Sequence, residues 1–128
     1  MADYLLDTTA LIDYFRGRTG IIELVGALAH QGHHLGLCCV SVAELYAGLS
    51  EDESSAATPL IDSMEYHEIS LATAKEAGRY RYEFARRGRA LSTTDTLIAA
   101  TAIAVGAILI TANTRDFPME ELEILEHS

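Results

Sequence analysis

The chain has 128 residues, of which 49% are hydrophobic and 22% charged, and this is the size and composition of one globular domain rather than of a disordered segment. Nineteen acidic residues against nine basic ones give a formal net charge of -10, which disfavours an ordinary electrostatic DNA-binding module. Phosphate groups could approach such a chain only where a local feature, such as a bound cation, reverses the field.

Short apolar runs alternate with helical patterns along the whole chain. Buried strands are predicted at residues 4–6, 34–40, 66–69, 107–111 and 122–125. Helices are predicted at residues 8–15, 21–29, 42–49, 54–64, 72–87 and 96–105. Thr8 or Thr9 is expected to cap the first helix and Ser41 the third, while Asp95 opens the last. Pro59 and Pro118 are expected at element boundaries.

The alternation of strands and helices indicates the fold class. No linker or repeat divides the sequence, so residues 1–128 are predicted to form a single domain. An alternating order favours a three-layer α/β/α sandwich around a mostly parallel sheet. In such folds ligands bind beyond the carboxyl ends of the strands.

Three features bear on the compartment of the protein. The uncharged segment 96–114 approaches the length of a membrane helix, but alanines, threonines and Gly106 argue against a span. The first residues include Asp3 and Asp7 and do not resemble a secretory signal. The adjacent Cys38 and Cys39 are predicted to be free thiols in a reducing compartment. We therefore expect a cytoplasmic protein without a membrane partner.

Four acidic residues fall at the predicted ligand edge of the sheet. Asp7 follows the first strand, Glu44 lies in the first turn of the helix after the second strand, Asp95 opens a helix, and Asp116 follows the strand 107–111. Taken singly, Asp95 could be a helix cap, and Asp7 or Asp116 could be turn residues. Carboxylates that converge in a cleft repel one another unless divalent cations bind them, and Mg²⁺ or Mn²⁺ prefers such oxygen ligands.

The segments that carry these acids resemble the four acidic motifs of PIN-domain nucleases. They read LDTT at 6–9, SVAEL at 41–45, DTLIAATA at 95–102 and TANTRDF at 111–117. Their order and spacing also match those of the family. Within it the chain most resembles the VapC toxins of VapBC-type toxin–antitoxin pairs, and the resemblance runs over about residues 4–125.

This resemblance implies an endoribonuclease that depends on Mg²⁺ or Mn²⁺, hydrolyses RNA phosphodiester bonds with metal-activated water, and is neutralised by a cognate VapB-like antitoxin. RNA rather than DNA as substrate rests on the resemblance alone. The resemblance also implies a homodimer or a larger toxin–antitoxin hetero-oligomer. The residues that it marks as catalytic and metal-binding are Asp7, Glu44, Asp95 and Asp116. Thr9 and Asn113 resemble supporting polar residues of the family, although both could equally be turn or cap residues.

A cluster of arginines offers a possible substrate contact. Five of the nine basic residues are arginines within residues 79–89, next to two tyrosines. Arg79 and Arg86 share one face of the predicted helix, so they could bind RNA phosphates while the tyrosines stack on bases. The alternative is a solvated helix face in which these arginines pair with Glu76 and Glu83.

Two other functions fit parts of the sequence. A phosphatase that transfers a phosphoryl group to an aspartate would also use an acid at a strand end. Such an enzyme would normally need a lysine late in the chain, and here the only lysine is Lys75. A catalytically silent PIN-like module that binds RNA or protein would be expected to lack one or more of the four acids, and all four are present.

Overall fold

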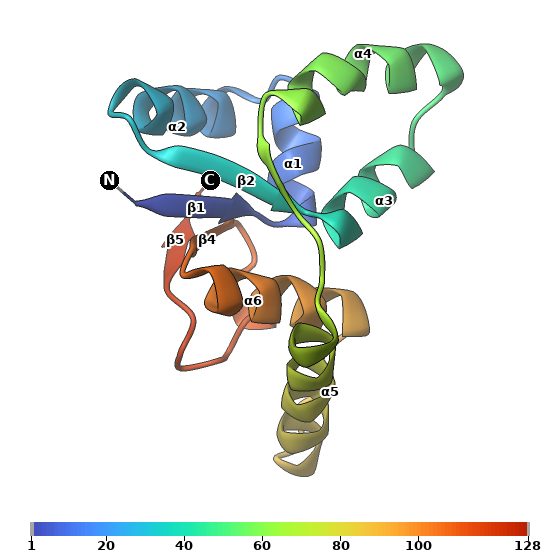
Figure 1. The fold of residues 1–128 in the computed structure, drawn as a ribbon, viewed down its shortest axis with the longest axis vertical. Coiled ribbons are helices and arrows are strands. Elements are labelled where there is room, and N and C mark those ends of the chain that lie inside the picture. The colour runs from blue at the N-terminus through green and yellow to red at the C-terminus, as the bar shows by residue number, and fades with distance from the viewer. Residues whose placement is uncertain (1, 128) are drawn as a thin grey trace.

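A five-stranded sheet forms the centre of the computed structural model, which describes residues 2–127 (Figure 1). Met1 and Ser128 belong to the predicted domain but lie outside the described residues. The strand order is β3-β2-β1-β4-β5, and every neighbouring pair is parallel. The strands are β1 (Asp3–Leu6), β2 (His34–Cys38), β3 (Glu65–His67), β4 (Ile108–Thr111) and β5 (Ile124–Glu126).

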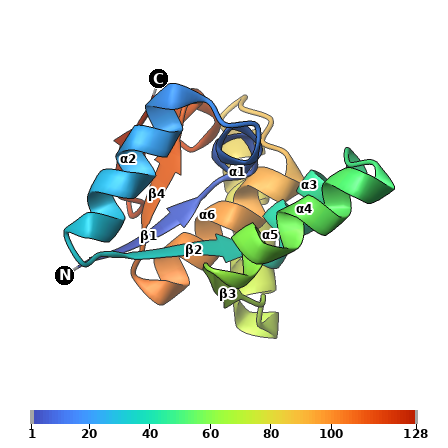
Figure 2. The same cartoon turned by 90° about the horizontal axis from the view of Figure 1, so that it is seen from above.

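Helices cover both faces of this sheet, as Figures 1 and 2 show from two directions. One face carries α1 (Thr8–Phe15), α2 (Thr19–His30), α3 (Cys39–Ala47) and α4 (Glu51–Asp62). The other carries α5 (Leu71–Arg86) and α6 (Thr93–Val105), and a short 3-10 helix, η1 (Thr114–Asp116), follows β4. The predicted three-layer α/β/α sandwich is therefore confirmed, and its sheet is wholly parallel.

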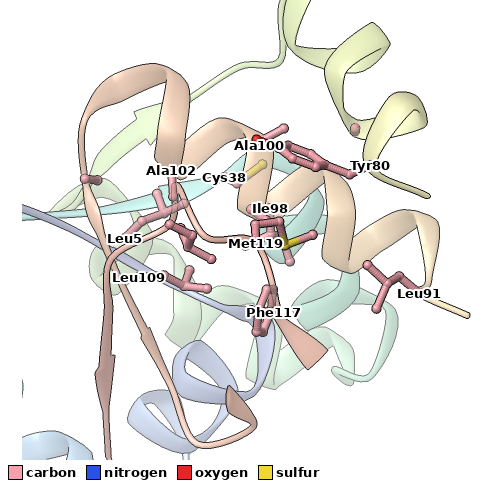
Figure 3. Close-up of a cluster of buried hydrophobic side chains, with 14 of the residues drawn as sticks. Leu5, Cys38, Tyr80, Leu91, Ile98, Ala100, Ala102, Leu109, Phe117 and Met119 are labelled. Atoms are coloured by element: carbon pink, nitrogen blue, oxygen red, sulfur yellow. The ribbon is translucent and has the colours of Figure 1, made fainter. Parts of the chain in front are cut away.

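Alternate residues of the central strands fill two separate cores. Leu5 and Leu109 belong to the core on the side of α5 and α6, whereas Leu6 and Ile110 belong to the core on the side of α1 to α4. This is the two-residue period of a strand that is buried on both faces. Figure 3 shows the first core, in which Tyr80 of α5 reaches the side chains packed beneath α6.

The start of α4 differs from the prediction because of a capping box. The Ser50 side chain accepts a hydrogen bond from the Glu53 backbone N–H at 3.2 Å, and the Glu53 carboxylate accepts one from the Ser50 N–H at 3.0 Å. These reciprocal bonds start the helix at Glu51 instead of residue 54. As a result Pro59 lies inside the helix and not at an element boundary, so that expectation was wrong.

The uncharged segment 96–114 divides into two elements. It begins in α6, which ends where Gly106 adopts a left-handed backbone with φ of 69°, and it continues into β4. Glycine takes this conformation without the strain that a Cβ atom causes. Among the helices of residues 2–127, none combines the length and the apolar character of a membrane span.

The chain order places a ligand crevice beside β1. This strand pairs with β2 on one side and with β4 on the other, and the helices that lead to these two neighbours lie on opposite faces of the sheet. In open parallel sheets such a reversal leaves a crevice at the carboxyl ends of the two strands. The ends of β1 and β4 are therefore where a functional site is expected.

Candidate functional site

Asp7 follows β1 directly and lies in this crevice with only 3% of its surface exposed. Its Oδ1 accepts a hydrogen bond from the Ala10 backbone N–H at 2.8 Å, which makes Asp7 the N-cap of α1. Its Oδ2 accepts a hydrogen bond from the Thr111 hydroxyl at 2.5 Å. The prediction of a cap at Thr8 or Thr9 was wrong, because the extended backbone of Asp7 brings its own carboxylate over the helix end.

Thr111 connects the end of β4 to Asp7. It is fully buried, and its oxygen also accepts a hydrogen bond from the Asn113 backbone N–H at 2.9 Å. Because this oxygen is already an acceptor, the hydroxyl proton is available for the Asp7 carboxylate. The two strand ends on either side of the crevice are thus joined by a buried, charge-assisted hydrogen bond.

Glu44 lies farther along its helix than predicted. The helix α3 begins at Cys39, because Cys38 is the extended N-cap residue, so Glu44 is in the second turn and not the first. Ser41, the predicted cap, is instead a fully buried residue inside the helix. The Thr8 hydroxyl donates a hydrogen bond to Glu44 Oε1 at 2.5 Å. This bond ties the carboxylate to the start of α1.

Asp95 is in the first turn of α6, but it does not cap the helix. The cap is Ser92, whose hydroxyl oxygen accepts a hydrogen bond from the Asp95 backbone N–H at 3.0 Å. The helix therefore begins at Thr93, before the predicted start at residue 96. Ser92 therefore takes the capping role that the sequence also allowed for Asp95, which lies instead in the first turn of the helix.

Burial and charge act in opposite directions on Asp7. Burial raises the pKa of the Asp7 carboxyl, while the hydrogen bonds from Thr111 and Ala10 lower it. The nearby His127 imidazole also lowers this pKa, and the negative charge of Asp95 raises it. The hydrogen bonds thus partly offset the cost of a charge in this buried position.

The charges of the remaining two acids act on the Asp95 carboxyl. Burial raises the pKa of the Asp95 carboxyl, the hydrogen bond with Ser92 lowers it, and the charges of Asp116 and Glu44 raise it further. Since the charge of Asp95 also acts on Asp7, Asp95 lies close enough to each of the other three predicted carboxylates for their charges to interact, and we call these four residues the electrostatic cluster.

The sequence analysis did not identify three polar residues of this region as site residues. Thr8 and Thr111 hold two of the carboxylates, and His127 lies buried after β5 and donates its backbone N–H to the Thr111 carbonyl at 3.1 Å. All three stand at or just beyond the carboxyl end of a strand. The same positional criterion that selected the acids would have found them had it been applied to every polar residue.

The other predicted site residues lie around or away from the cluster. Thr9 is exposed in the first turn of α1, and Asn113 is exposed before η1, where its carbonyl accepts a hydrogen bond from the Asp116 N–H at 3.0 Å. Arg79 and Arg86 lie on α5. Arg79 forms ion pairs with Glu76 and Glu83, which is the arrangement expected of a solvated helix face.

The chemistry of the cluster suits a hard divalent cation. Its side-chain donors are carboxylate and hydroxyl oxygens, the ligand type that Mg²⁺ and Mn²⁺ prefer. Two of the carboxylates are already held by hydroxyl donors. Burial and the charges of Asp116 and Glu44 raise the pKa of Asp95, and a cation would offset both effects. The residues present therefore fit a metal site.

A second group of possible ligands lies at the opposite end of the strands. Ligand atoms of Asp3, His34 and Glu65, at the starts of β1, β2 and β3, lie within 4.8 Å of one another, and all three residues are exposed. Across residues 2–127 no other three such atoms come so close, so the four carboxylates at the carboxyl ends are spaced more widely. The exposure of all three residues and the imidazole ligand make this second group less suited to Mg²⁺.

The raised pKa of Asp95 predicts that this residue destabilises the metal-free fold at neutral pH. An acid whose pKa is higher in the folded state than its ordinary value of 3.8 makes folding less favourable once it ionises. The contribution of Asp95 to stability should therefore be least unfavourable below this value and become more unfavourable as the pH rises through the raised pKa. We expect Asp95→Asn to raise the Tm in chelator at about pH 7, with a gain that shrinks toward about pH 4.

Thermal unfolding at both pH values measures this effect. Asp62→Asn removes a carboxylate from an exposed position on α4 and is the matched control, for which no such pH-dependent gain is expected. Equal Tm values for Asp95→Asn and the unmodified protein at both pH values would show that ionised Asp95 does not destabilise the fold.

Known proteins resemble this chain in sequence and in fold. The PIN domain family profile matches residues 4–121. Over 115 residues the chain is 33% identical to Ribonuclease VapC19 of Mycobacterium tuberculosis, and the match covers 90% of this chain and 92% of that protein. A chain of VapBC2 from Rickettsia felis, bound to a promoter DNA fragment, superposes with a TM-score of 0.87 at 22% identity and covers 98% and 99% of the two chains. A chain of DNA-bound VapBC from Salmonella typhimurium has a TM-score of 0.85 at 23% identity, with 98% of each chain covered.

Proposed function

The chain belongs to the PIN domain family, and from this premise we propose that it is a metal-dependent endoribonuclease, the toxin of a VapBC-type toxin–antitoxin pair, with residues 1–128 as a single PIN domain. The observation that carries the proposal is the electrostatic cluster of Asp7, Glu44, Asp95 and Asp116 at the ends of β1 and β4. The relationship to a ribonuclease that is 33% identical over 90% of the chain supports RNA as the substrate.

The four carboxylates would hold Mg²⁺ or Mn²⁺, with Asp7 and Asp95 as the principal ligands and Glu44 and Asp116 completing the site. A divalent cation supplies positive charge that lowers the pKa of water and stabilises a phosphate under attack. The chain needs no nucleophilic side chain of its own for hydrolysis of this kind.

The protein's part in the reaction is to hold its charges in place. Ala10 and Thr111 each occupy one oxygen of Asp7, and Thr8 binds Glu44, so these two carboxylates have little freedom to turn. Ligands that are held in this way require less reorganisation when the site is occupied. Thr9 and Asn113, both exposed at the rim, are proposed to contact the substrate.

We propose a VapB-like antitoxin as the protein partner. Support comes from the structural neighbours, which are chains of VapBC complexes, and from the cluster itself, because four carboxylates attract an arginine or lysine side chain. Such a cation from the partner would compete with the metal. A homodimer, alone or within a larger complex with the antitoxin, is proposed as the state of the toxin.

Cleavage of total cellular RNA by the purified protein, freed of any co-purifying partner, tests this function. We expect discrete fragments with Mg²⁺ or Mn²⁺ and none with a chelator, because the carboxylates alone repel the phosphate backbone. The absence of cleavage under every metal condition would overturn the proposal and favour the catalytically silent RNA- or protein-binding module.

A further inference from the structure

A groove of about 430 Å³ lies between α5 and α6. Its lining is mainly apolar and includes Ala74, Gly78, Arg81, Tyr82, Ala85 and Leu97. Tyr82 is 62% exposed there, although it is one of the larger apolar side chains of the protein. An exposed aromatic ring beside an apolar groove provides a surface on which a nucleobase can stack.

The first turn of α6 contributes residues both to this α5–α6 groove and to the carboxylate cluster. Thr93 and Thr96 line the groove, whereas Asp95 lies on another face of the same helical turn. Arg81 of α5 is hydrogen-bonded to the start of α6 and the residues before it. Its guanidinium donates to the Leu91 carbonyl at 2.9 Å and to the Thr93 hydroxyl at 3.0 Å. An extended chain that passes around the first turn of α6 could therefore reach from the groove to the cluster.

The border of the groove is positive, although the whole chain carries a net charge of -10. The ion pairs formed within residues 2–127 do not include Arg81, Arg86 or Arg89. These three donate to uncharged acceptors: Arg81 to a carbonyl and a hydroxyl, Arg86 to the Tyr82 hydroxyl at 3.0 Å, and Arg89 to the carbonyl of Arg115, the residue before Asp116. Uncharged acceptors leave the positive charge of a guanidinium free to attract phosphates.

Resting on the proposed ribonuclease function, we propose that the α5–α6 groove binds a nucleobase of single-stranded RNA close to the scissile phosphate. Tyr82 provides the stacking surface, and Arg86, whose guanidinium lies 5.4 Å from the centre of that ring, orients it. Arg81 and Arg89 neutralise the phosphates that lead from the groove to Asp95 and Asp116. The neighbouring Arg79 is already engaged by two glutamates and should contribute less than Arg86.

Binding of a fluorescent single-stranded RNA oligonucleotide, followed by anisotropy with Mg²⁺ present, tests this inference. The protein carries Asp7→Asn so that binding is read without cleavage. We expect Tyr82→Ala to weaken binding by roughly 5- to 150-fold, the range for removal of one base–aromatic stack, and Tyr82→Phe to preserve most of the affinity. Arg86→Ala should weaken binding and make the slope of log affinity against log salt concentration shallower by about 0.7 for each phosphate that is no longer neutralised.

Arg18→Ala is the matched control, since it removes one exposed positive charge at the start of α2. It should leave RNA affinity close to that of the parent protein. Equal affinities for Tyr82→Ala and Arg18→Ala would overturn the inference. So would a Tyr82→Ala protein that binds RNA normally but changes its sedimentation, because the groove would then be an interface between copies of the chain.

The outcomes separate this inference from the proposed function. If the unmodified protein cleaves RNA and Tyr82→Ala binds and cleaves normally, the nuclease stands and the groove assignment fails. If the unmodified protein does not cleave but its RNA binding depends on Tyr82, the groove assignment stands and the protein is a binding module.

Discussion

Replacing Asp7 or Asp95 by asparagine is expected to lower the rate of metal-dependent RNA cleavage by roughly a hundred- to a thousandfold. Each change keeps the shape of the side chain but removes one negative charge from the cluster, in which the charge of Asp95 acts on Asp7. Asparagine is also a good N-cap, so Asp7→Asn should preserve the start of α1. The measurement is the initial rate of fragment formation from a defined RNA in saturating Mg²⁺ or Mn²⁺.

Asp62→Asn controls for the loss of a negative charge as such. Asp62 ends α4 and is exposed, so this variant should cleave at the rate of the unmodified protein. Circular dichroism establishes that all three variants are folded. If folded Asp7→Asn and Asp95→Asn cleave at normal rates, the carboxylates of the cluster are not needed for cleavage.

Thr111→Val is expected to lower activity by roughly 10- to 100-fold without touching a carboxylate, the usual effect of removing a group that orients a metal ligand. Valine keeps the branched shape of threonine at this fully buried position but cannot donate to Asp7 or accept from Asn113. The Asp7 carboxylate would then be held by the Ala10 N–H alone and would lose a hydrogen bond that lowers its pKa. Thr111→Ser keeps the hydroxyl and should retain most of the activity.

The pH dependence of the cleavage rate distinguishes positioning from simple packing. Because the Thr111 bond lowers the pKa of Asp7, its removal should move the acid limb of the profile to higher pH in Thr111→Val and not in Thr111→Ser. A loss of activity in Thr111→Val with an unshifted acid limb and unchanged metal affinity would mean that the residue only supports β4.

The sequence predicted most of the architecture because strands and helices carry different periods. The apolar runs of β1 and β4 and the glycine that separates α6 from β4 are local signals, and the parallel sheet follows from their order. From this order alone the acids at the strand ends could be expected to meet. The structure agrees for Asp7 and Asp95 and adds the influence of Glu44 and Asp116 on the latter.

Helix starts and hydroxyl contacts were less predictable because they depend on competition between neighbouring polar residues. Thr8, Thr9 and Asp7 are all good caps, and the choice of Asp7 follows from the direction in which β1 delivers the chain. The partner of Asp7 is 104 positions away at Thr111, so no local pattern reveals it. For Arg79 the helical spacing allowed both an RNA contact and ion pairs. Only the structure distinguishes between them, because it shows Arg79 paired with Glu76 and Glu83.

A crystal soaked with Mn²⁺ and measured for anomalous scattering tests whether the carboxylates at the ends of β1 and β4 form the metal site. We expect an anomalous peak between Asp7 and Asp95 that disappears in Asp95→Asn. A peak at Asp3, His34 and Glu65 with none beside Asp7 would contradict this assignment, since the cation would then lie at the opposite end of the sheet.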